Sequence, residues 1–257
     1  MSGADYVKDN ELIWDKRSEN GDRWSLPVSR EEIAEAKAGN WHILLTPEKY
    51  VPRNWFPEDM KGVRILCLAG GGGQQGPVLA AAGAEVTVFD NSTKQLEKDI
   101  LVAERDGLTI KTVQGNMQDL SAFEDGAFDI IVHPWSNNYV DDVLPVWREC
   151  ARVLREGGIL LAGFGSPLEY IFDPTKLENG EFVPKYSIPY ADKDHLDDPK
   201  IKEITDAEGF SWGHPVEDNI QGQISAGFAL IGFYEDRGCF ALDKYINTSM
   251  ATKAVKL

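Results

Sequence analysis

The sequence predicts an α/β protein built on a doubly wound, mostly parallel sheet of seven strands, with an N-terminal cap and an inserted lid. Three observations lead to this fold. Short apolar runs rich in branched residues alternate with helical stretches between residues 61 and 164. A run of four glycines directly follows the first apolar run. The chain of 257 residues is long enough to bury the core of one large domain, and such alternation places helices on both faces of a parallel sheet.

The first 60 residues are predicted to form a cap segment in front of the sheet. Ser29-Arg-Glu-Glu32 matches a capping box, in which the serine and the glutamate each accept a backbone amide of the other residue. Gly39 is expected to end the helix that begins there. The segment also contains four of the seven tryptophans, Trp14, Trp24, Trp41 and Trp55.

Residues 61–164 supply the parallel part of the sheet. The predicted strands are short and rich in branched residues, and they comprise residues 63–69, 85–89, 109–113, 128–132 and 159–164. The predicted helices between them comprise residues 76–82, 93–105 and 141–154. Strands joined through helices in this way run parallel.

The rest of the chain is predicted to insert a lid and to complete the sheet. Residues 165–214 are rich in proline and aromatic residues, and an irregular segment of this length inside a compact domain is typical of a functional lid. Pro215 suits the first turn of a helix that ends at Gly227. Strands over residues 228–234 and 250–256 follow with a hairpin-like connection, so we expect the last strand to run antiparallel to the others.

The glycine loop Gly70-Gly-Gly-Gly-Gln-Gln-Gly76 is the main candidate for a ligand site. It follows the first predicted strand, where open parallel sheets bind their ligands, and glycines let the backbone approach a ligand closely. No Lys-Ser or Lys-Thr ends the loop, which excludes a P-loop. Asp90 ends the second strand and suits ribose hydroxyls, so the loop fits either a dinucleotide or S-adenosylmethionine.

Composition predicts a cytoplasmic protein that binds neither nucleic acid nor a membrane. The formal charge of −16, without a basic cluster, repels phosphate backbones. The apolar run Ile65–Ala69 is too short to cross a bilayer, and the polar start Met1–Asn10 is not a secretory signal. The three cysteines lack the spacing of a disulfide framework or a structural zinc site.

Five segments then occur in one order along the chain. They are the loop Gly70–Gly73, Asp90 at the end of the second strand, Gln114–Met117, Phe123–Val132 and Arg152–Leu161. In this order they resemble the motifs of the class I S-adenosylmethionine-dependent methyltransferases, over about residues 61–257. The run Leu68–Gln75 resembles, in particular, an uncharacterised bacterial branch of that family. The resemblance implies the Rossmann-like methyltransferase fold.

The resemblance also implies S-adenosylmethionine as the cofactor and a set of residues that contact it. These are Gly70, Gly71, Gly72, Gly73, Gln75, Asp90, Asn91, Asn116, Met117 and His133. Asp90 is expected to bind the ribose hydroxyls, and Asn116 with Met117 the adenine. Two departures stand out, because Cys67 replaces the acidic residue of the family's loop motif and Ala69 replaces its first glycine.

Chemistry is expected at the residues after the fourth strand. His133 is the candidate general base because histidine titrates near neutrality, with a hydrogen bond to the cofactor or the loop as the alternative role. Trp135 and Tyr139 are expected to line the acceptor pocket, unless they are core aromatics. Tyr50 and Trp55 are expected to cover it, unless they only pack the front helix on the sheet.

The acidic run Asp192–Asp198 is predicted to be a solvated turn, and no metal ion is predicted.

Together the predicted fold, the motifs and the composition predict a methyltransferase that uses S-adenosylmethionine and acts on a small molecule. An NAD(P)-dependent oxidoreductase is one alternative, although no Tyr-x-x-x-Lys pair supports it. A non-catalytic module that binds S-adenosylmethionine is the other, because the acid missing at Cys67 leaves room for it.

Overall fold

The computed structural model describes residues 5–257 and contains a seven-stranded sheet in the order β3-β2-β1-β4-β5-β9-β8. Its strands are β1 (Arg64–Leu68), β2 (Glu85–Asp90), β3 (Ile110–Gln114), β4 (Phe128–His133), β5 (Leu154–Gly165), β8 (Phe228–Asp236) and β9 (Ser249–Lys256). The pairings from β3 through β5 are parallel, whereas β9 is antiparallel to both β5 and β8. The predicted fold class and the antiparallel last strand are confirmed.

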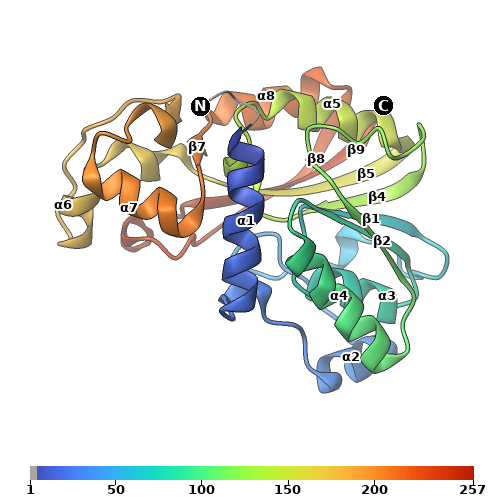
Figure 1. The fold of residues 1–257 in the computed structure, drawn as a ribbon. Coiled ribbons are helices and arrows are strands. Elements are labelled where there is room, and N and C mark those ends of the chain that lie inside the picture. Colours follow the sequence, from blue (N-terminus) through green and yellow to red (C-terminus); the bar gives the residue numbers. More distant parts are fainter. Residues whose placement is uncertain (1–4) are drawn as a thin grey trace.

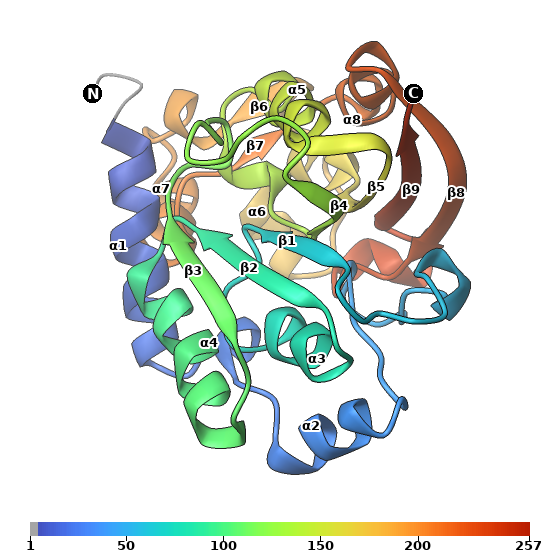
Figure 2. The ribbon, with the colours of Figure 1, turned by 90° about the vertical axis from the view of Figure 1, so that its right-hand side faces the viewer.

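Helices cover both faces of this sheet (Figure 2). Around the sheet lie α2 (Arg30–Lys37), α3 (Gln75–Ala81) and α4 (Thr93–Asp106) on one face, and α5 (Leu144–Val153) and α8 (Val216–Ser225) on the other. The remaining helices are α1 (Asp5–Glu19), α6 (Pro174–Glu178) and α7 (Pro199–Glu208). Short 3₁₀ helices are η1 (Arg23–Ser25), η2 (Arg53–Trp55), η3 (Asn137–Tyr139), η4 (Pro167–Ile171), η5 (Asp192–Asp194) and η6 (Ala241–Lys244).

The central strand β1 shows why its sequence is apolar without alternation. Ile65 and Cys67 pack into the core cluster on the side of α2 and α3, whereas Leu66 and Leu68 pack into the cluster on the side of α5. Successive side chains of a strand point to opposite faces, so a strand covered by helices on both faces buries every residue. The end of such a strand opens between the two layers, and this places the glycine loop at the edge of the sheet.

The predicted capping box at the start of α2 forms as expected. The Glu32 amide donates to the Ser29 hydroxyl at 3.1 Å, and the Ser29 amide donates to the Glu32 carboxylate at 2.7 Å. The helix ends at Lys37, two residues before Gly39. Local capping chemistry therefore predicted this helix correctly.

Helix α1 was not predicted, because the side chains that it buries are not an apolar stripe. Among its buried residues are Asn10 and Ser18, so the 3.6-residue hydrophobic period is missing. The Asn10 side chain bonds the backbone of Phe210 in both directions, accepting its amide at 2.7 Å and donating to its carbonyl at 3.1 Å. Tertiary hydrogen bonds thus hold a helix that has little amphipathic pattern.

The lid segment (residues 165–214) is more regular than predicted. It contains η4, α6, α7 and η5, together with a two-stranded sheet of β6 (Tyr190–Ala191) and β7 (Trp212–Gly213). Both helices begin with an aspartate cap followed by proline, at Asp173-Pro174 and Asp198-Pro199. This start signal was present in the sequence, so the prediction of an irregular segment is wrong. Figure 1 shows α6 and α7 on the far side of α1 from α4.

No helix within residues 5–257 combines the length and the apolar character needed to cross a membrane.

Candidate functional site

A cavity of about 670 Å³ opens at the carboxyl ends of β1, β2 and β4. Three parts of the chain line it. The first is the edge of the sheet, with the glycine loop and the residues that follow β2, β3 and β4. The second is the cap segment, through α1, η1 and residues 44–47, and the third is the lid segment with residues 238–242. Residues far apart in the sequence therefore enclose one pocket.

The first two glycines of the loop line the pocket, whereas the next two do not. Gly70 and Gly71 line the pocket, and the Gly71 amide donates to the Asp90 carboxylate at 3.0 Å. A Cβ atom on Gly71 would lie 2.8 Å from the Cβ atom of Gln95, so only glycine fits there. Gly72 and Gly73 were predicted to contact the cofactor, but they are not among the residues that line the pocket. Their amides point to a second carboxylate beneath the loop.

That second carboxylate belongs to Asp99 of α4, which the sequence analysis missed. One oxygen of its fully buried carboxyl accepts the Gly72 and Gly73 amides at 3.0 and 3.1 Å. Cys67, at the position of the family's acid, is a buried thiol whose pKa is raised by burial and by Asp99. Asp99 thus holds the loop from a different element. The sequence did contain one sign of this role, because Asp99 lies on the buried face of α4 together with the apolar residues Leu96 and Val102.

The Asp99 carboxyl should make stability depend on pH. Burial raises its pKa to about 8, whereas a carboxyl of an unfolded chain titrates near about 4. Between these values the folded protein keeps a proton that the unfolded chain has lost, so stability is present at low pH and is lost as pH rises through about 8.

The variant D99N, which imitates the protonated form, is expected to lose less stability than the wild type between about pH 5 and pH 8. Denaturant unfolding at several pH values measures this difference. Equal pH slopes for the two proteins would contradict the assignment.

Asp90 lies where the sequence predicted, at the end of β2 on the pocket wall. Its second carboxylate oxygen accepts the Ser92 amide at 2.9 Å. Burial raises the pKa of Asp90 to about 6, although the backbone amides around it lower the pKa. This carboxylate therefore both fixes the loop and lines the pocket.

The other predicted cofactor residues at this edge line the pocket as well. Asn116 and Met117 follow β3, and Asn91 follows β2. The Asn91 side chain donates to the Val7 carbonyl of α1 at 2.7 Å. The Gln75 side chain donates to the backbone carbonyl of Leu44 at 3.1 Å and so ties α3 to the cap segment. Each of these residues therefore borders the pocket, and two of them also hold the cap segment.

His133 does not line the pocket. Its ring is fully buried. Nδ1 lies 2.9 Å from the Leu68 carbonyl oxygen, and Nε2 lies 2.6 Å from Oδ1 of Asn137. Burial lowers its pKa. The structure therefore corrects the predicted catalytic and cofactor contacts, since both nitrogens of His133 are engaged inside the protein at the end of β4.

The two predicted covering aromatics also lie away from the pocket. Tyr50 is 59% exposed and stacks on His42, with ring centroids 4.7 Å apart. Trp55 is buried against Tyr234 of β8, with ring centroids 5.4 Å apart. Neither lines the cavity. The same stretch does reach the pocket through residues 44–47, because Gly163 leaves room for the Leu45 backbone beside β5.

Trp135 and Tyr139 do line the pocket, on the loop between β4 and α5. The Trp135 ring meets the Phe240 ring edge to face at 5.5 Å, and Tyr139 meets Trp14 of α1 in the same way at 5.4 Å. These contacts join the β4 loop to the cap segment and to residues 238–242. Both aromatics are wall residues of the cavity rather than members of the sheet core.

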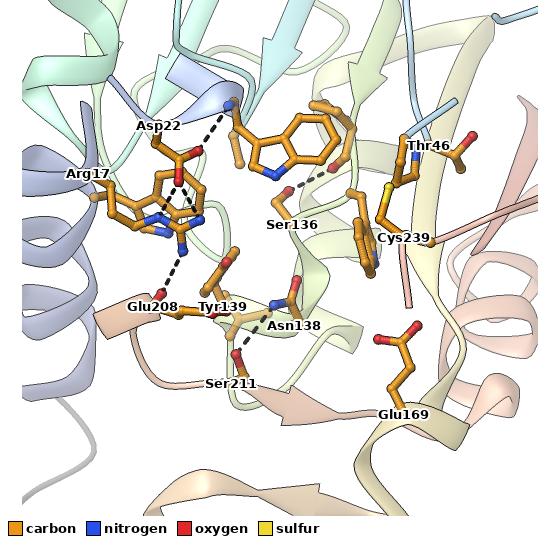
Figure 3. Close-up of a pocket in the computed structure, with 18 of the residues that line it drawn as sticks. Arg17, Asp22, Thr46, Ser136, Asn138, Tyr139, Glu169, Glu208, Ser211 and Cys239 are labelled. Carbon is orange, nitrogen blue, oxygen red and sulfur yellow. Dashed lines mark hydrogen bonds and ion pairs between the residues drawn. The ribbon is translucent and has the colours of Figure 1, made fainter. Parts of the chain in front are cut away.

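The cap segment contributes a charged group that the sequence analysis missed. Arg17 of α1 pairs with Asp22 at 2.8 Å, and the other Asp22 oxygen accepts the Trp24 amide at 2.9 Å (Figure 3). Arg17 also donates to the Glu208 carbonyl at 3.4 Å. This group connects α1 to the end of α7 and closes one side of the pocket.

The run Asp192–Asp198 is solvated only in part, because Lys193, Asp194 and Asp197 are exposed whereas Asp192 is buried. Asp192 is 4% exposed, lines the pocket and accepts the Ser211 amide at 2.8 Å. Asp198 caps α7, and His195 stacks on Tyr190 with centroids 5.2 Å apart. Within residues 5–257, no group of three or more His, Cys, Asp or Glu side chains is arranged to hold a metal ion.

The sheet order, the glycine loop at the end of β1 and the carboxylate at the end of β2 define a nucleotide-cofactor site of the Rossmann-like type. Comparisons with known proteins then give the family. Residues 66–162 match the family model of a methyltransferase domain. The chain is 54% identical to the uncharacterized methyltransferase YbaJ of Bacillus subtilis (strain 168), over 98% of both chains. It therefore belongs to the class I S-adenosylmethionine-dependent methyltransferases and is an enzyme that uses the family's cofactor.

More distant proteins support the same fold. A ubiquinone biosynthesis O-methyltransferase of Xanthomonas oryzae is 29% identical over 40% of this chain and 43% of its own length. A solved S-adenosylmethionine-dependent methyltransferase of Mesorhizobium loti superposes with a TM-score of 0.60 at 17% identity, over 79% of this chain and 95% of the other. The 1,6-didemethyltoxoflavin-N1-methyltransferase of Burkholderia thailandensis also gives 0.60, at 12% identity, over 100% and 91%.

Proposed function

We propose that this methyltransferase transfers the methyl group of S-adenosylmethionine to a small molecule in the cytoplasm. The observation that supports the proposal is one continuous cavity, which reaches from the glycine loop into the interior of the lid segment. A pocket of this size suits small ligands rather than a polymer. The formal charge of −16 also opposes a nucleic-acid acceptor.

In this proposal the edge of the sheet binds the cofactor. The Gly70 and Gly71 backbone approaches it closely, Asp90 accepts its ribose hydroxyls, and Asn116 with Met117 borders its adenine. An amide side chain both accepts and donates, so Asn116 is chemically suited to the adenine edge. The buried Gln95 side chain lines the same end, and its Oε1 has no partner among the described residues. A ligand donor there would satisfy it.

The same proposal assigns a role to each part of the chain. Residues 1–60 act as a cap and residues 61–257 as the methyltransferase domain, with the lid segment inserted. The described part of the cap and the lid segment both line the cavity, so they exclude water from the sulfonium. Methyl transfer is an in-line displacement that gains much of its rate from positioning, and a pocket lined by the sheet edge, the cap segment and the lid segment provides that positioning.

The first test separates cofactor from acceptor. Calorimetric titration should show binding of S-adenosylmethionine and S-adenosylhomocysteine, and none of NADH or NADPH. The protein is then incubated with methyl-labelled cofactor and a bacterial cytoplasmic extract, divided by ultrafiltration into small molecules and macromolecules. We expect label in the small-molecule fraction. Label confined to the macromolecules would overturn the proposed acceptor class.

A further inference from the structure

The lid segment presents a buried carboxyl group with an unused oxygen to the pocket. Glu169 in η4 lines the cavity, and its Oε1 is buried without a hydrogen-bond partner among residues 5–257. Figure 3 shows the side chain rising from its ribbon into the pocket, with no dashed line at its carboxyl. A buried polar atom that is left without a hydrogen-bond partner destabilises the folded protein. Such a group on a pocket wall indicates a donor on the ligand.

The charge of this carboxyl points to the kind of donor. Burial raises the pKa of Glu169 to about 9, and the negative charge of Asp243 raises it further, whereas the Thr248 hydroxyl lowers it. Among these groups only the Thr248 hydroxyl stabilises the ionised form, and no cation does. A cation in the pocket would do so, because an opposite charge close to a carboxyl favours its ionised form.

The cations that line the pocket do not meet Glu169. Within the described residues they are Arg17 and Arg23, both in the cap segment. Arg17 pairs with Asp22, and each arginine lies over a tryptophan ring at 4.2 and 4.0 Å. No ion pair joins either of them to Glu169 in this part of the chain. Glu169 therefore has no cationic partner among the described residues that line the pocket.

Aromatic rings surround the same part of the cavity. Those of the lid segment that line it are Tyr170, Phe172, Tyr186 and Tyr190. Aromatic rings attract cations and stack on flat ligands. The Tyr190 hydroxyl is a second buried polar atom without a partner in the described residues. Aromatic walls with an unpaired carboxyl are a suitable receptor for an organic cation that carries N–H donors.

We infer that the lid side of the pocket binds the protonated nitrogen of an aromatic or heteroaromatic amine, and that Glu169 selects it. This inference rests on the proposed function, since the amine is the methyl acceptor molecule. Glu169 recognises the ammonium group, whichever atom of the acceptor receives the methyl.

The experiment compares ligands of equal shape that differ in charge. Tryptamine with tryptophol, and phenethylamine with phenethyl alcohol, are titrated into protein saturated with S-adenosylhomocysteine. We expect each amine to bind at least about tenfold more tightly than its alcohol, since a hydrogen bond between charged groups is stronger than one between neutral groups. The isosteric variant E169Q should abolish this preference. The matched variant E178Q should keep it, because Glu178 also lines the pocket but already pairs with Lys200 at 2.6 Å.

Each of the other outcomes would overturn either the inference about Glu169 or the proposed function. Equal binding of amines and alcohols to the wild type, or of neither, overturns the inference and does not depend on how any variant folds. A preference that survives in E169Q also overturns it, with water in the adjacent cavity of about 20 Å³ as the carboxyl's partner. A loss of S-adenosylhomocysteine affinity in E169Q would assign Glu169 to the cofactor instead. Failure of the wild type to bind that nucleotide would overturn the proposed function itself.

Discussion

Replacing Asp90 with alanine is expected to lower the affinity for S-adenosylmethionine and S-adenosylhomocysteine by about a hundredfold or more. Each hydrogen bond from a ribose hydroxyl to a carboxylate contributes about 1.5–3 kcal/mol, and two would be lost. The substitution also frees the Gly71 amide, which the Asp90 carboxylate accepts at 3.0 Å. Calorimetric titration of D90A with both nucleotides measures the loss.

The control for this prediction is D197A. Asp197 is an exposed carboxylate that does not line the pocket, so the variant changes the net charge by the same amount. Its cofactor affinity should stay within about twofold of the wild type. Circular dichroism should show that D90A remains folded. If D90A binds both nucleotides as tightly as D197A does, Asp90 is not the ribose ligand.

Replacing Gly73 with alanine is expected to damage both stability and cofactor binding. Gly73 has φ +73°, which costs an alanine about 1–2 kcal/mol. Its added Cβ would lie 2.9 Å from the Lys98 carbonyl oxygen of α4, next to the Asp99 that holds the loop. The loop must therefore move. We expect the Tm to fall by more than about 5 °C and nucleotide affinity to fall at least about tenfold, measured by thermal unfolding and calorimetry.

Gly180 provides a matched control for the backbone strain. It has nearly the same φ, +77°, but a Cβ there would meet no atom within 4 Å. G180A should therefore lose only about 2–4 °C and bind the nucleotides normally. Similar losses in the two variants would show that backbone strain alone, rather than the contact with α4, explains the effect of G73A.

Most of the sheet followed from local patterns in the sequence. The predicted strand 85–89 and helix 93–105 differ from β2 and α4 by one residue at most. Strand β5 is longer than predicted, because Arg155, Glu156 and Gly157 near its start are exposed and break the apolar run. The secondary structure of the lid segment was predicted poorly, because its many proline and aromatic residues were taken as a sign of irregular structure. The two aspartate-proline pairs that begin its helices were not used.

The residues of the candidate site also fall into those that the sequence predicted and those that it did not. Asp90, Asn116 and Met117 line the pocket as predicted, because strand order and the resemblance to the family place them at the ends of β2 and β3. Asp99 and Glu169 were not found, because their role depends on which distant backbone or cavity they face. His133 follows a strand in the expected position, yet its ring turns inward to Leu68 and Asn137. Sequence position gives the strand end, but not the direction of the side chain.

The sequence by itself determined the fold class, the glycine loop, the carboxylate that follows β2 and the methyltransferase family. These depend on short-range periodicity and on motif order, both of which can be recognised from residues that are close together in the sequence. The tertiary structure decided which carboxylate supports the loop, which aromatics enclose the pocket and which acid remains unpaired within it. Such properties arise when α1, α4 and the lid segment pack together, because burial and hydrogen-bond partners depend on residues that are distant in sequence.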